Sequence, residues 1–340
     1  MPSSHWLFLA VFACVPACSE NSRATSGGPS ASDGGGDGSV GADLRITQLQ
    51  AKGTHNSYHV ETPGTPIPDW QYSEKPLDVQ LESEGVRAVE LDTHFDEAAH
   101  LLRVYHVPGV DQGTTCQLFT DCLTTIRVWS DAHPKHHVLF VHIEPKEAAL
   151  NQTVDFAAYA DLMDETILSV WSRERIVAPA DVQGTAATLR DAVTTTGFPS
   201  IESTRGKVLF YLNERAGFHD AYTRGGDDIS GRIVFPESHV DEPIGGVVIL
   251  NDPLNDPIAD AVGQGFLVRT SCDGVPRPAD TDARREAALA SGAHIVSTDY
   301  PDPTAVDAGG SAFVMPGGTP SRCNPKTAPE SCTSESIEKL

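Results

Sequence analysis

Short apolar runs alternate along the chain with longer stretches in which apolar residues recur at helical spacing. The apolar runs cover residues 46–52, 86–92, 101–106, 138–144, 208–213, 233–235 or 247–250, 265–270 and 294–299. Helical spacing is clearest over residues 151–175, 185–196 and 280–291. Strands that alternate with helices are typical of a parallel sheet, so the pattern predicts an α/β domain.

The number of apolar runs favours a closed barrel over an open sheet. The runs give eight strands if either residues 233–235 or residues 247–250 form the sixth. Eight strands match a (β/α)8 barrel over residues 44–315. The gap between residues 92 and 101 is too short for a crossover helix, so we expect the barrel to be irregular there. An open doubly wound sheet is the alternative, but the chain has no glycine-rich phosphate loop to support it.

Polar residues mark the ends of the first four runs. Chemistry in an α/β barrel takes place at the carboxyl ends of its strands, so these residues are candidates for a functional site. The second run ends in two carboxylates that are two residues apart, a spacing that places both on one face of a strand. In chain order, the residues at the four ends are His55, Asn56, Glu90, Asp92, His106 and Glu144.

Each of these side chains taken singly fits a capping, hydrogen-bonding or ion-pairing role. Together, three carboxylates and an amide oxygen at one barrel mouth would repel one another unless a hard cation lies among them. Ligands that are all oxygen suit Ca²⁺ or Mg²⁺ better than zinc. Two histidines beside such a metal can transfer protons, which contributes roughly 10²–10⁴-fold to a rate. The pattern therefore predicts a metal-assisted site that cleaves phosphodiesters.

The formal net charge of −23 narrows the class of partner. Such a charge argues against nucleic acid as a ligand, because a phosphate backbone would be repelled. It also argues against electrostatic adsorption to anionic lipid. A negatively charged substrate that approaches this surface needs a local cation to offset the repulsion, and a bound metal ion would supply one.

Four short segments give the chain a resemblance to a known family. They are His55-Asn56, Glu90-Leu91-Asp92, Tyr105-His106 and Ile143-Glu144. With residues 265–270 and 292–300 as the last two strands, their order and spacing resemble the phosphatidylinositol-specific phospholipase C superfamily. The similarity is closest to the calcium-dependent bacterial branch of that superfamily, and it runs from about residue 44 to residue 301.

The resemblance implies both a site and a reaction. It implies one calcium ion and an acid–base pair, with the calcium ligands Asn56, Glu90, Asp92 and Glu144 and the pair His55 and His106. The implied reaction is attack of an inositol 2-hydroxyl on phosphorus, which gives a cyclic phosphate and releases diacylglycerol. Which histidine is the acid and which the base stays open, and a carboxylate such as Glu90 could share the role of the base.

One departure from the family concerns the headgroup of the substrate. Eukaryotic members carry lysines at the end of the fifth strand that bind additional ring phosphates, whereas this chain has Tyr211 and Asn213 there. We therefore do not expect a polyphosphorylated headgroup. Lys146 and Arg269 are the remaining cationic candidates for substrate binding.

Two other functions remain as alternatives. A glycerophosphodiester phosphodiesterase shares the barrel and the metal position, but such enzymes begin with His-Arg-Gly on the first strand, and this chain has His-Asn-Ser. A catalytically silent surface module stabilised by calcium is the other alternative, and the presence of both histidines and all four metal ligands argues against it. Ser57, Tyr58 and His59 receive no role in any of these interpretations.

The N-terminus has the features of an export signal. Residues 6–17 form an apolar run that is too short to span a bilayer and has the length of a signal-peptide core, although no lysine or arginine precedes it. Val15-Pro16-Ala17-Cys18 resembles a bacterial lipobox, so we expect residues 1–18 to be a signal with a lipidated Cys18. Residues 19–43, rich in Gly, Ser and Asp, would be a flexible linker. We expect a monomeric cell-surface or outer-membrane lipoprotein, with a secreted protein as the alternative.

Export suggests that the cysteines form disulfides. If Cys14 is removed and Cys18 is acylated, the cysteines that remain are Cys116, Cys122, Cys272, Cys323 and Cys332. Cys116 with Cys122 and Cys323 with Cys332 are the local pairings, although the sequence does not fix the connectivity. No spacing of cysteines and histidines suggests zinc. The tail, residues 316–340, would be a disulfide-pinned strap or a disordered end.

Overall fold

A computed structural model describes residues 44–146, 154–275, 278–304, 306–307 and 310–339. The expected signal, the lipidated Cys18 and the linker lie outside these residues and stay predictions. Within the described part of the chain, no helix is both long enough and apolar enough to cross a membrane.

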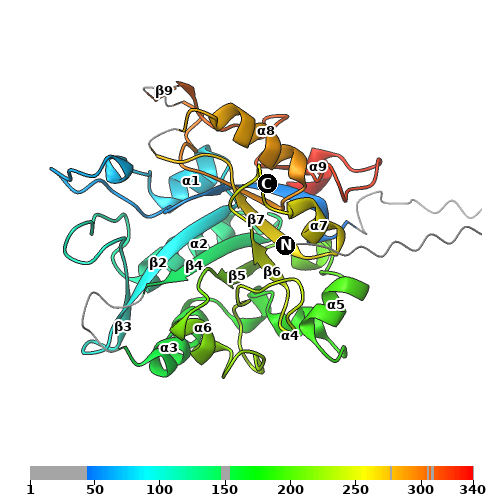
Figure 1. The fold of residues 1–340 in the computed structure, drawn as a ribbon, viewed down its shortest axis with the longest axis horizontal. Helices are drawn as coiled ribbons and strands as arrows, with labels where there is room; N and C mark the ends of the chain where they lie inside the picture. The colour runs from blue at the N-terminus through cyan, green and yellow to red at the C-terminus, as the bar shows by residue number, and fades with distance from the viewer. Residues whose placement is uncertain (1–43, 147–153, 276–277, 305, 308–309, 340) are drawn as a thin grey trace, which may run out of the picture. The chain divides into compact units, whose positions relative to one another are not determined.

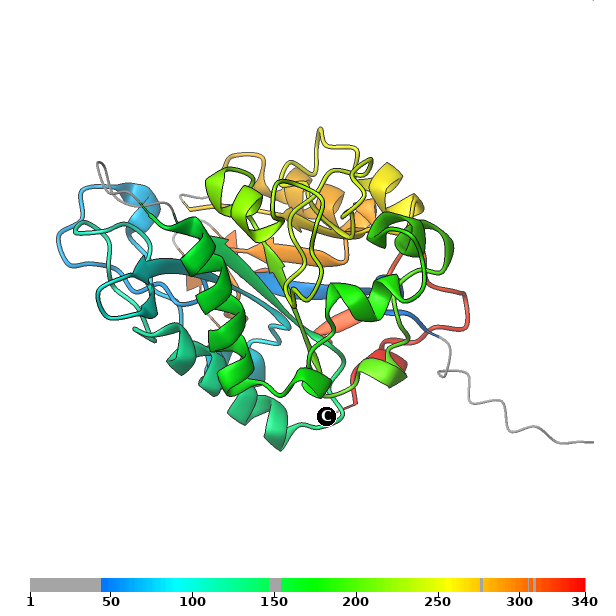
Figure 2. The same cartoon turned by 90° about the horizontal axis from the view of Figure 1, so that it is seen from below.

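Seven parallel strands form a nearly closed barrel, and Figures 1 and 2 show helices packed around them. The strands are β1 (Leu49–Thr54), β2 (Ala88–Asp96), β4 (Leu139–Pro145), β5 (Val208–Leu212), β6 (Val247–Ile249), β7 (Leu267–Ser271) and β8 (Ile295–Thr298). Their order is β5-β4-β2-β1-β8-β7-β6. Every residue of β1 and of β5 is buried, as expected for strands covered on both faces. The predicted barrel is therefore confirmed.

An irregular segment bridges the two end strands of this order. Phe235 pairs with Tyr211 in β5, and Glu237 pairs with Val247 in β6, both in the parallel sense. The two segments between which the sequence left a choice therefore both contribute. Residues 247–249 form β6, and the segment around Phe235 closes most of the gap between β6 and β5.

The third apolar run is not a barrel strand, which corrects the expectation from the sequence. It forms β3 (Leu101–Val104), which pairs antiparallel with the end of β2, with Val104 opposite Thr93 and Leu101 opposite Asp96. The four residues between the two strands allow only a tight turn, because a parallel partner needs a crossover of a dozen residues or more. Figure 1 shows this hairpin reaching past the other strands.

The helices lie mainly between the strands. They are α1 (Leu77–Ser83), α2 (Phe119–Ala132), α3 (Phe156–Val170), α4 (Pro179–Gln183), α5 (Leu189–Thr195), α6 (Gly217–Tyr222), α7 (Ile258–Gly263), α8 (Thr281–Ser291) and α9 (Ser334–Ile337). The three predicted helices correspond to α3, α5 and α8. The sequence does not predict the 14-residue α2, because threonines and a valine, β-branched residues that favour strands, stand between the members of its buried face.

The tail crosses the barrel as a pinned strap, one of the two forms expected. Its strand β11 (Ser321–Cys323) pairs antiparallel with β1, and Glu338 forms an ion pair with the buried Arg87 at 3.2 Å. The local disulfides Cys116–Cys122 and Cys323–Cys332 are both present, and Cys272 is free and buried. These cysteine pairings are confirmed.

His294 illustrates why several histidines stay neutral in the folded protein. Its Nδ1 accepts a hydrogen bond from the Val268 amide at 3.0 Å, and its Nε2 lies 2.9 Å from the Thr47 carbonyl. Protonation would place a second N–H against the Val268 donor. Burial lowers the pKa of His294 to about 4. Burial has the same effect on the pKa of three other rings, each about 4, which are His94, His136 and His137.

These rings predict a loss of stability in mild acid. Unfolded histidine has a pKa of about 6.5, so below that pH the unfolded chain binds more protons than the folded chain. Stability is therefore lost as the pH falls from about 6.5 towards about 4, by about 1.4 kcal/mol for each such ring at about pH 5.5. Between pH 7.5 and 5.5, the free energy of unfolding measured with denaturant should fall by about 1.4 kcal/mol less in H294Q than in wild type. An H100N control, at an exposed turn position, should match wild type, and equal losses in all three proteins would contradict this account.

Candidate active site

The turn after β1 is fixed to β2 by Ser57. The Ser57 hydroxyl donates to the Thr54 carbonyl at 3.1 Å and accepts from the Glu90 amide at 2.8 Å, and the Ser57 amide donates to the Glu90 carbonyl at 3.1 Å. Asn56, between these anchors, has a φ of 42°, which asparagine tolerates better than most residues. The turn therefore holds His55 and Asn56 beside Glu90, and Ser57 has a structural role that the sequence did not reveal.

The register between β2 and β4 brings three carboxylates together. Asp92 lies directly opposite Glu144 in the parallel pairing, and Glu90 projects from the same strand as Asp92. One oxygen from each of the three carboxylates lies within 4.8 Å of the others. Glu90 and Asp92 are buried, whereas Glu144 is partly exposed. The predicted convergence of these carboxylates at the barrel mouth is thus present.

Two cationic or proton-donating groups hold Glu90 from behind. Its Oε2 lies 3.0 Å from Nδ1 of His142 and 2.9 Å from a guanidinium nitrogen of Arg269. Although burial favours the neutral acid, the His142 and His55 rings and Arg269 hold the pKa of Glu90 well below its usual range. Its Oε1 faces the site, 3.7 Å from Nε2 of His55, and is available to a ligand.

Of the three carboxylates, Asp92 has the fewest hydrogen-bond partners to stabilise its negative charge. Both its oxygens are buried and accept no hydrogen bond of good geometry from the described residues, although Nζ of Lys146 lies 2.9 Å from Oδ2. Burial raises the pKa of Asp92 to about 8, with Lys146 acting against the shift and the Glu144 and Glu90 carboxylates adding to it. A cation of higher charge beside Asp92 would stabilise its ionised form.

The donor set fits a hard cation. Lys146 also contacts Glu144, whose other oxygen accepts from Asn213 at 3.2 Å. Among the residues that the structure describes, the Asn56 side-chain oxygen accepts only a long hydrogen bond, 3.4 Å, from the Tyr58 hydroxyl. An amide oxygen with little competition and three clustered carboxylates are ligands of the kind that Ca²⁺ prefers.

His55 lies between two carboxylates at the edge of this group. Its Nδ1 is 2.6 Å from Asp299, which stands at the end of β8, and its Nε2 faces Glu90. Burial alone would favour the neutral ring, but the Asp299 and Glu90 carboxylates raise the pKa of His55 above its usual value. Because 40% of the side chain is exposed, the ring can exchange protons with a bound ligand.

His106 reaches the same mouth by a different route. It follows β3, and because β3 runs back along β2, the chain beyond Val104 returns beside the segment that carries Glu90 and Asp92. Its Nδ1 lies 2.9 Å from Asp111, and 20% of its side chain is exposed. An antiparallel hairpin therefore brings His106 to the candidate site, and not the end of a parallel strand.

The two residues proposed to bind substrate, Arg269 and Lys146, both contact side chains of the protein itself. Arg269 is 3% exposed and donates to Glu90, Asn251 and Ser297. Lys146 contacts Asp92 and Glu144, and 23% of its side chain is exposed. These contacts balance the carboxylate group, and direct contact of either residue with a substrate stays a prediction.

Several partners of the site were not found from the sequence. Asp299 ends the last apolar run, so the rule that selected Glu144 could have selected it as well. Asp111 and Tyr72 lie in loops, where periodicity carries no signal. Tyr72 accepts a hydrogen bond from Asn56 at 3.2 Å and stacks on His59 at 4.3 Å between ring centroids.

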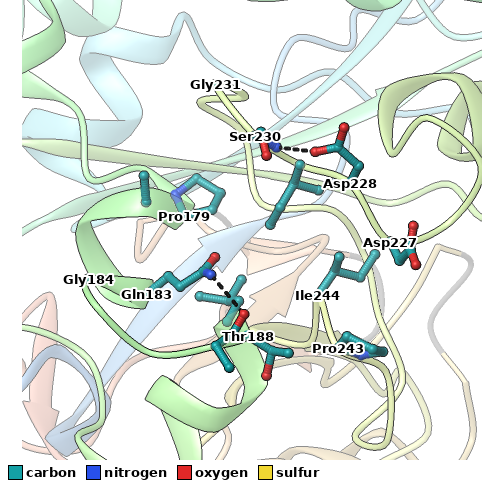
Figure 3. A pocket seen from close by; sticks show the side chains of 14 residues that line it. Pro179, Gln183, Gly184, Thr188, Asp227, Asp228, Ser230, Gly231, Pro243 and Ile244 are labelled. Carbon is teal, nitrogen blue, oxygen red and sulfur yellow. Dashed lines mark hydrogen bonds between the residues drawn. The ribbon is translucent and has the colours of Figure 1, made fainter.

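Two cavities help to delimit the site. One of about 320 Å³ adjoins it, since its walls include Asp299 and Tyr72. The other, about 390 Å³, lies between α4 and the loops at 227–231 and 243–244 (Figure 3). None of the predicted site residues lines this second cavity, and we assign it no part in the chemistry.

Comparison with known families gives one match. A model described as phosphoinositide phospholipase C, Ca²⁺-dependent, matches residues 99–325, more than half of the chain. The matched stretch includes His106 and Glu144, whereas the turn with His55 and the Glu90–Asp92 segment precede it. No curated protein matches the chain.

Solved structures share the fold. The calcium-dependent phosphoinositol-specific phospholipase C of a Pseudomonas species is 18% identical, with a TM-score of 0.59, over 84% of this chain and 97% of that one. The same enzyme as a myoinositol complex is 19% identical, with a TM-score of 0.59, over 84% and 96%. A Ca²⁺-dependent enzyme of this type from Streptomyces antibioticus is 19% identical, with a TM-score of 0.55, over 76% and 95%. At such identities the likeness concerns the barrel alone.

Proposed function

The chain belongs to the Ca²⁺-dependent phosphoinositide phospholipase C family, and from this membership we propose that it cleaves phosphatidylinositol-type phosphodiesters with the help of one calcium ion. The observation that carries the proposal is the carboxylate group at the barrel mouth, with His55 beside it and His106 carried to the same mouth by the hairpin. An enzyme that cleaves phosphodiesters by proton transfer needs a charge-neutralising centre and two groups that exchange protons.

Asn56, Glu90, Asp92 and Glu144 would hold the calcium ion. When bound, the ion would lower the pKa of the attacking hydroxyl and offset charge on the phosphoryl oxygens. Before it binds, Lys146 balances Asp92 and Glu144, so the ammonium would have to give up these contacts. Arg269 and His142 stay on the far oxygen of Glu90 and orient the other oxygen towards the site.

The proposed reaction forms one bond to phosphorus and breaks another. The inositol 2-hydroxyl oxygen attacks phosphorus, and the bond from phosphorus to the diacylglycerol oxygen breaks, which leaves a cyclic inositol phosphate. One member of the pair His55 and His106 accepts the hydroxyl proton, and the other donates a proton to the leaving oxygen. Asp299 and Asp111 each hold the Nδ1 side of one ring, which leaves Nε2 for the transfer.

Inositol is the headgroup that this proposal favours. One of the similar structures is a Pseudomonas enzyme as a myoinositol complex. At the end of β5, Tyr211 stacks on His142 and Asn213 donates to Glu144, so neither supplies a cation for further ring phosphates. We propose a headgroup that carries only its bridging phosphate.

Activity on phosphatidylinositol tests the proposal. Purified protein should release a cyclic inositol phosphate from phosphatidylinositol vesicles, detected by ³¹P NMR, and EGTA should abolish the release. His55→Ala and His106→Ala should each lower kcat by roughly 10²–10⁴-fold, because each removes a proton-transfer group. Calcium binding measured by calorimetry should persist in both variants.

Each alternative has its own outcome in the same experiment. The control variant H100N, changed at an exposed turn position, should retain full activity. Turnover that survives EGTA would remove calcium from the mechanism. Faster cleavage of glycerophosphodiesters than of phosphatidylinositol would favour a glycerophosphodiester phosphodiesterase, and a folded protein that turns over neither would favour a binding module.

We also propose that the protein is exported and tethered by a lipid on Cys18. The sequence supports this through an apolar core before a lipobox-like Val15-Pro16-Ala17-Cys18 and a following Gly/Ser/Asp-rich segment. A tether would hold the enzyme at a surface in spite of its net charge of −23.

Substitution of the lipidated cysteine tests the tether. In a bacterial host, the wild-type chain should fractionate with membranes, and C18A should move to the soluble exported fraction. Substitution of the neighbouring Cys14 by Ala should leave the wild-type distribution unchanged. The tether is excluded if C18A and wild type fractionate alike.

A further inference from the structure

Three side chains converge on one buried carboxylate beside His106. Asp111 is 0% exposed, and its Oδ2 lies 2.9 Å from Nδ1 of His106 and 2.9 Å from Nε2 of His59. The Thr62 hydroxyl donates to its other oxygen at 3.2 Å. His59 is also 0% exposed, so the pair of Asp111 and His59 forms a buried support behind the His106 ring, which is 20% exposed.

The backbone around this support is built to bring its parts together. Residues 107–111 form a tight turn, in which the Val107 and Asp111 backbones exchange hydrogen bonds at 2.8 and 2.9 Å. This turn folds the Asp111 side chain back onto the ring of His106. Beyond it, Gly113 packs so tightly against the loop that carries His59 that a Cβ at this position would lie 1.8 Å from the Val60 carbonyl oxygen.

The hydrogen-bonding capacity of the groups fixes the arrangement of protons. A carboxylate only accepts hydrogen bonds, so each ring must present an N–H to Asp111. His106 then carries its proton on Nδ1 and leaves Nε2 for exchange with a substrate. His59 carries its proton on Nε2, and its Nδ1 is buried with no hydrogen-bond partner among the described residues. An N–H on Nδ1 would find no acceptor among the described residues.

The support also joins the turn that carries the calcium-ligand candidate Asn56. The amide of His59 donates to the Asn56 carbonyl at 2.8 Å. Tyr72 stacks on the His59 ring and accepts from the Asn56 side chain at 3.2 Å. A shift of His59 would therefore disturb Asp111 on one side and Asn56 on the other.

We propose that Asp111 and His59 are positioning residues for His106: Asp111 fixes the ring with its proton on Nδ1, and His59 holds Asp111 in place. The expected loss of kcat rests on the proposed function, whereas the expected tautomer of His106 does not. In the serine protease triad, the aspartate that orients the catalytic histidine contributes roughly 10⁴-fold to kcat. This value sets an upper scale for the effect expected of Asp111.

The test combines ring tautomers with kinetics on the full chain. Long-range ¹H–¹⁵N spectra of the imidazoles should show neutral His106 protonated on Nδ1 in wild type and shifted towards Nε2 in D111N, whose amide can donate to the ring. On phosphatidylinositol vesicles, D111N should lower kcat by about 100-fold or more with little change in KM. His59→Phe removes the donor and keeps a ring, and should lower kcat about tenfold, whereas H59Q, which can still donate, should stay within about threefold of wild type.

Controls separate positioning from general damage. H294Q replaces an equally buried histidine away from the site and should leave the His106 tautomer and kcat unchanged. A His106 tautomer unaffected by D111N would overturn the role of Asp111. Equal losses of kcat in H59F and H59Q would overturn the role of His59. If wild type shows no phosphodiesterase activity, the proposed function fails, and the tautomers of His106 in wild type, D111N, H59F and H59Q still decide this inference.

Discussion

The mutual repulsion of three carboxylates at the mouth of the barrel is the constraint around which the surrounding side chains are arranged. Their nearest oxygens lie within 4.8 Å of one another, and two of the three residues are buried. Arg269 and His142 contact the far oxygen of Glu90 from behind, and Lys146 reaches between Asp92 and Glu144. Burial raises the pKa of Asp92 to about 8 even with Lys146 beside it, so the ionised form of Asp92 would gain from further positive charge. A divalent cation would supply further positive charge, and this connects the fold to the proposed chemistry.

The barrel brings the carboxylates together because the register between its strands fixes which residues lie side by side. Asp92 and Glu144 are direct partners in the β2–β4 pairing, and Ser57 ties the turn after β1 to Glu90 by two hydrogen bonds. Each histidine in turn has a buried aspartate on its Nδ1 side, Asp299 for His55 and Asp111 for His106. The metal-ligand candidates and the proposed proton-transfer histidines thus have separate supports, which meet at the turn after β1.

Much of this site could be read from the sequence because strand ends are strongly marked. Buried parallel strands are continuous apolar runs, so a polar residue at the end of one, such as Glu144, stands out. The direction of a strand leaves no such mark, so the pattern predicts a barrel strand at residues 101–106, where the structure has the antiparallel β3. The same pattern still predicts His106 as a candidate site residue. The partners in loops could not be predicted, because Asp111 reaches His106 only through a tight turn with Gly109 at a φ of 73°, a matter of tertiary geometry. Asp299 did carry the signal, since it ends the last apolar run.

The central claim is that the crowded carboxylates and Asn56 form one calcium site. Anomalous diffraction from crystals soaked in calcium tests it most directly. The account predicts a single ion bound by Asn56, Glu90, Asp92 and Glu144, with Nζ of Lys146 displaced from Asp92. A calcium-saturated crystal with no ion at these residues, and with Lys146 still between Asp92 and Glu144, would contradict it.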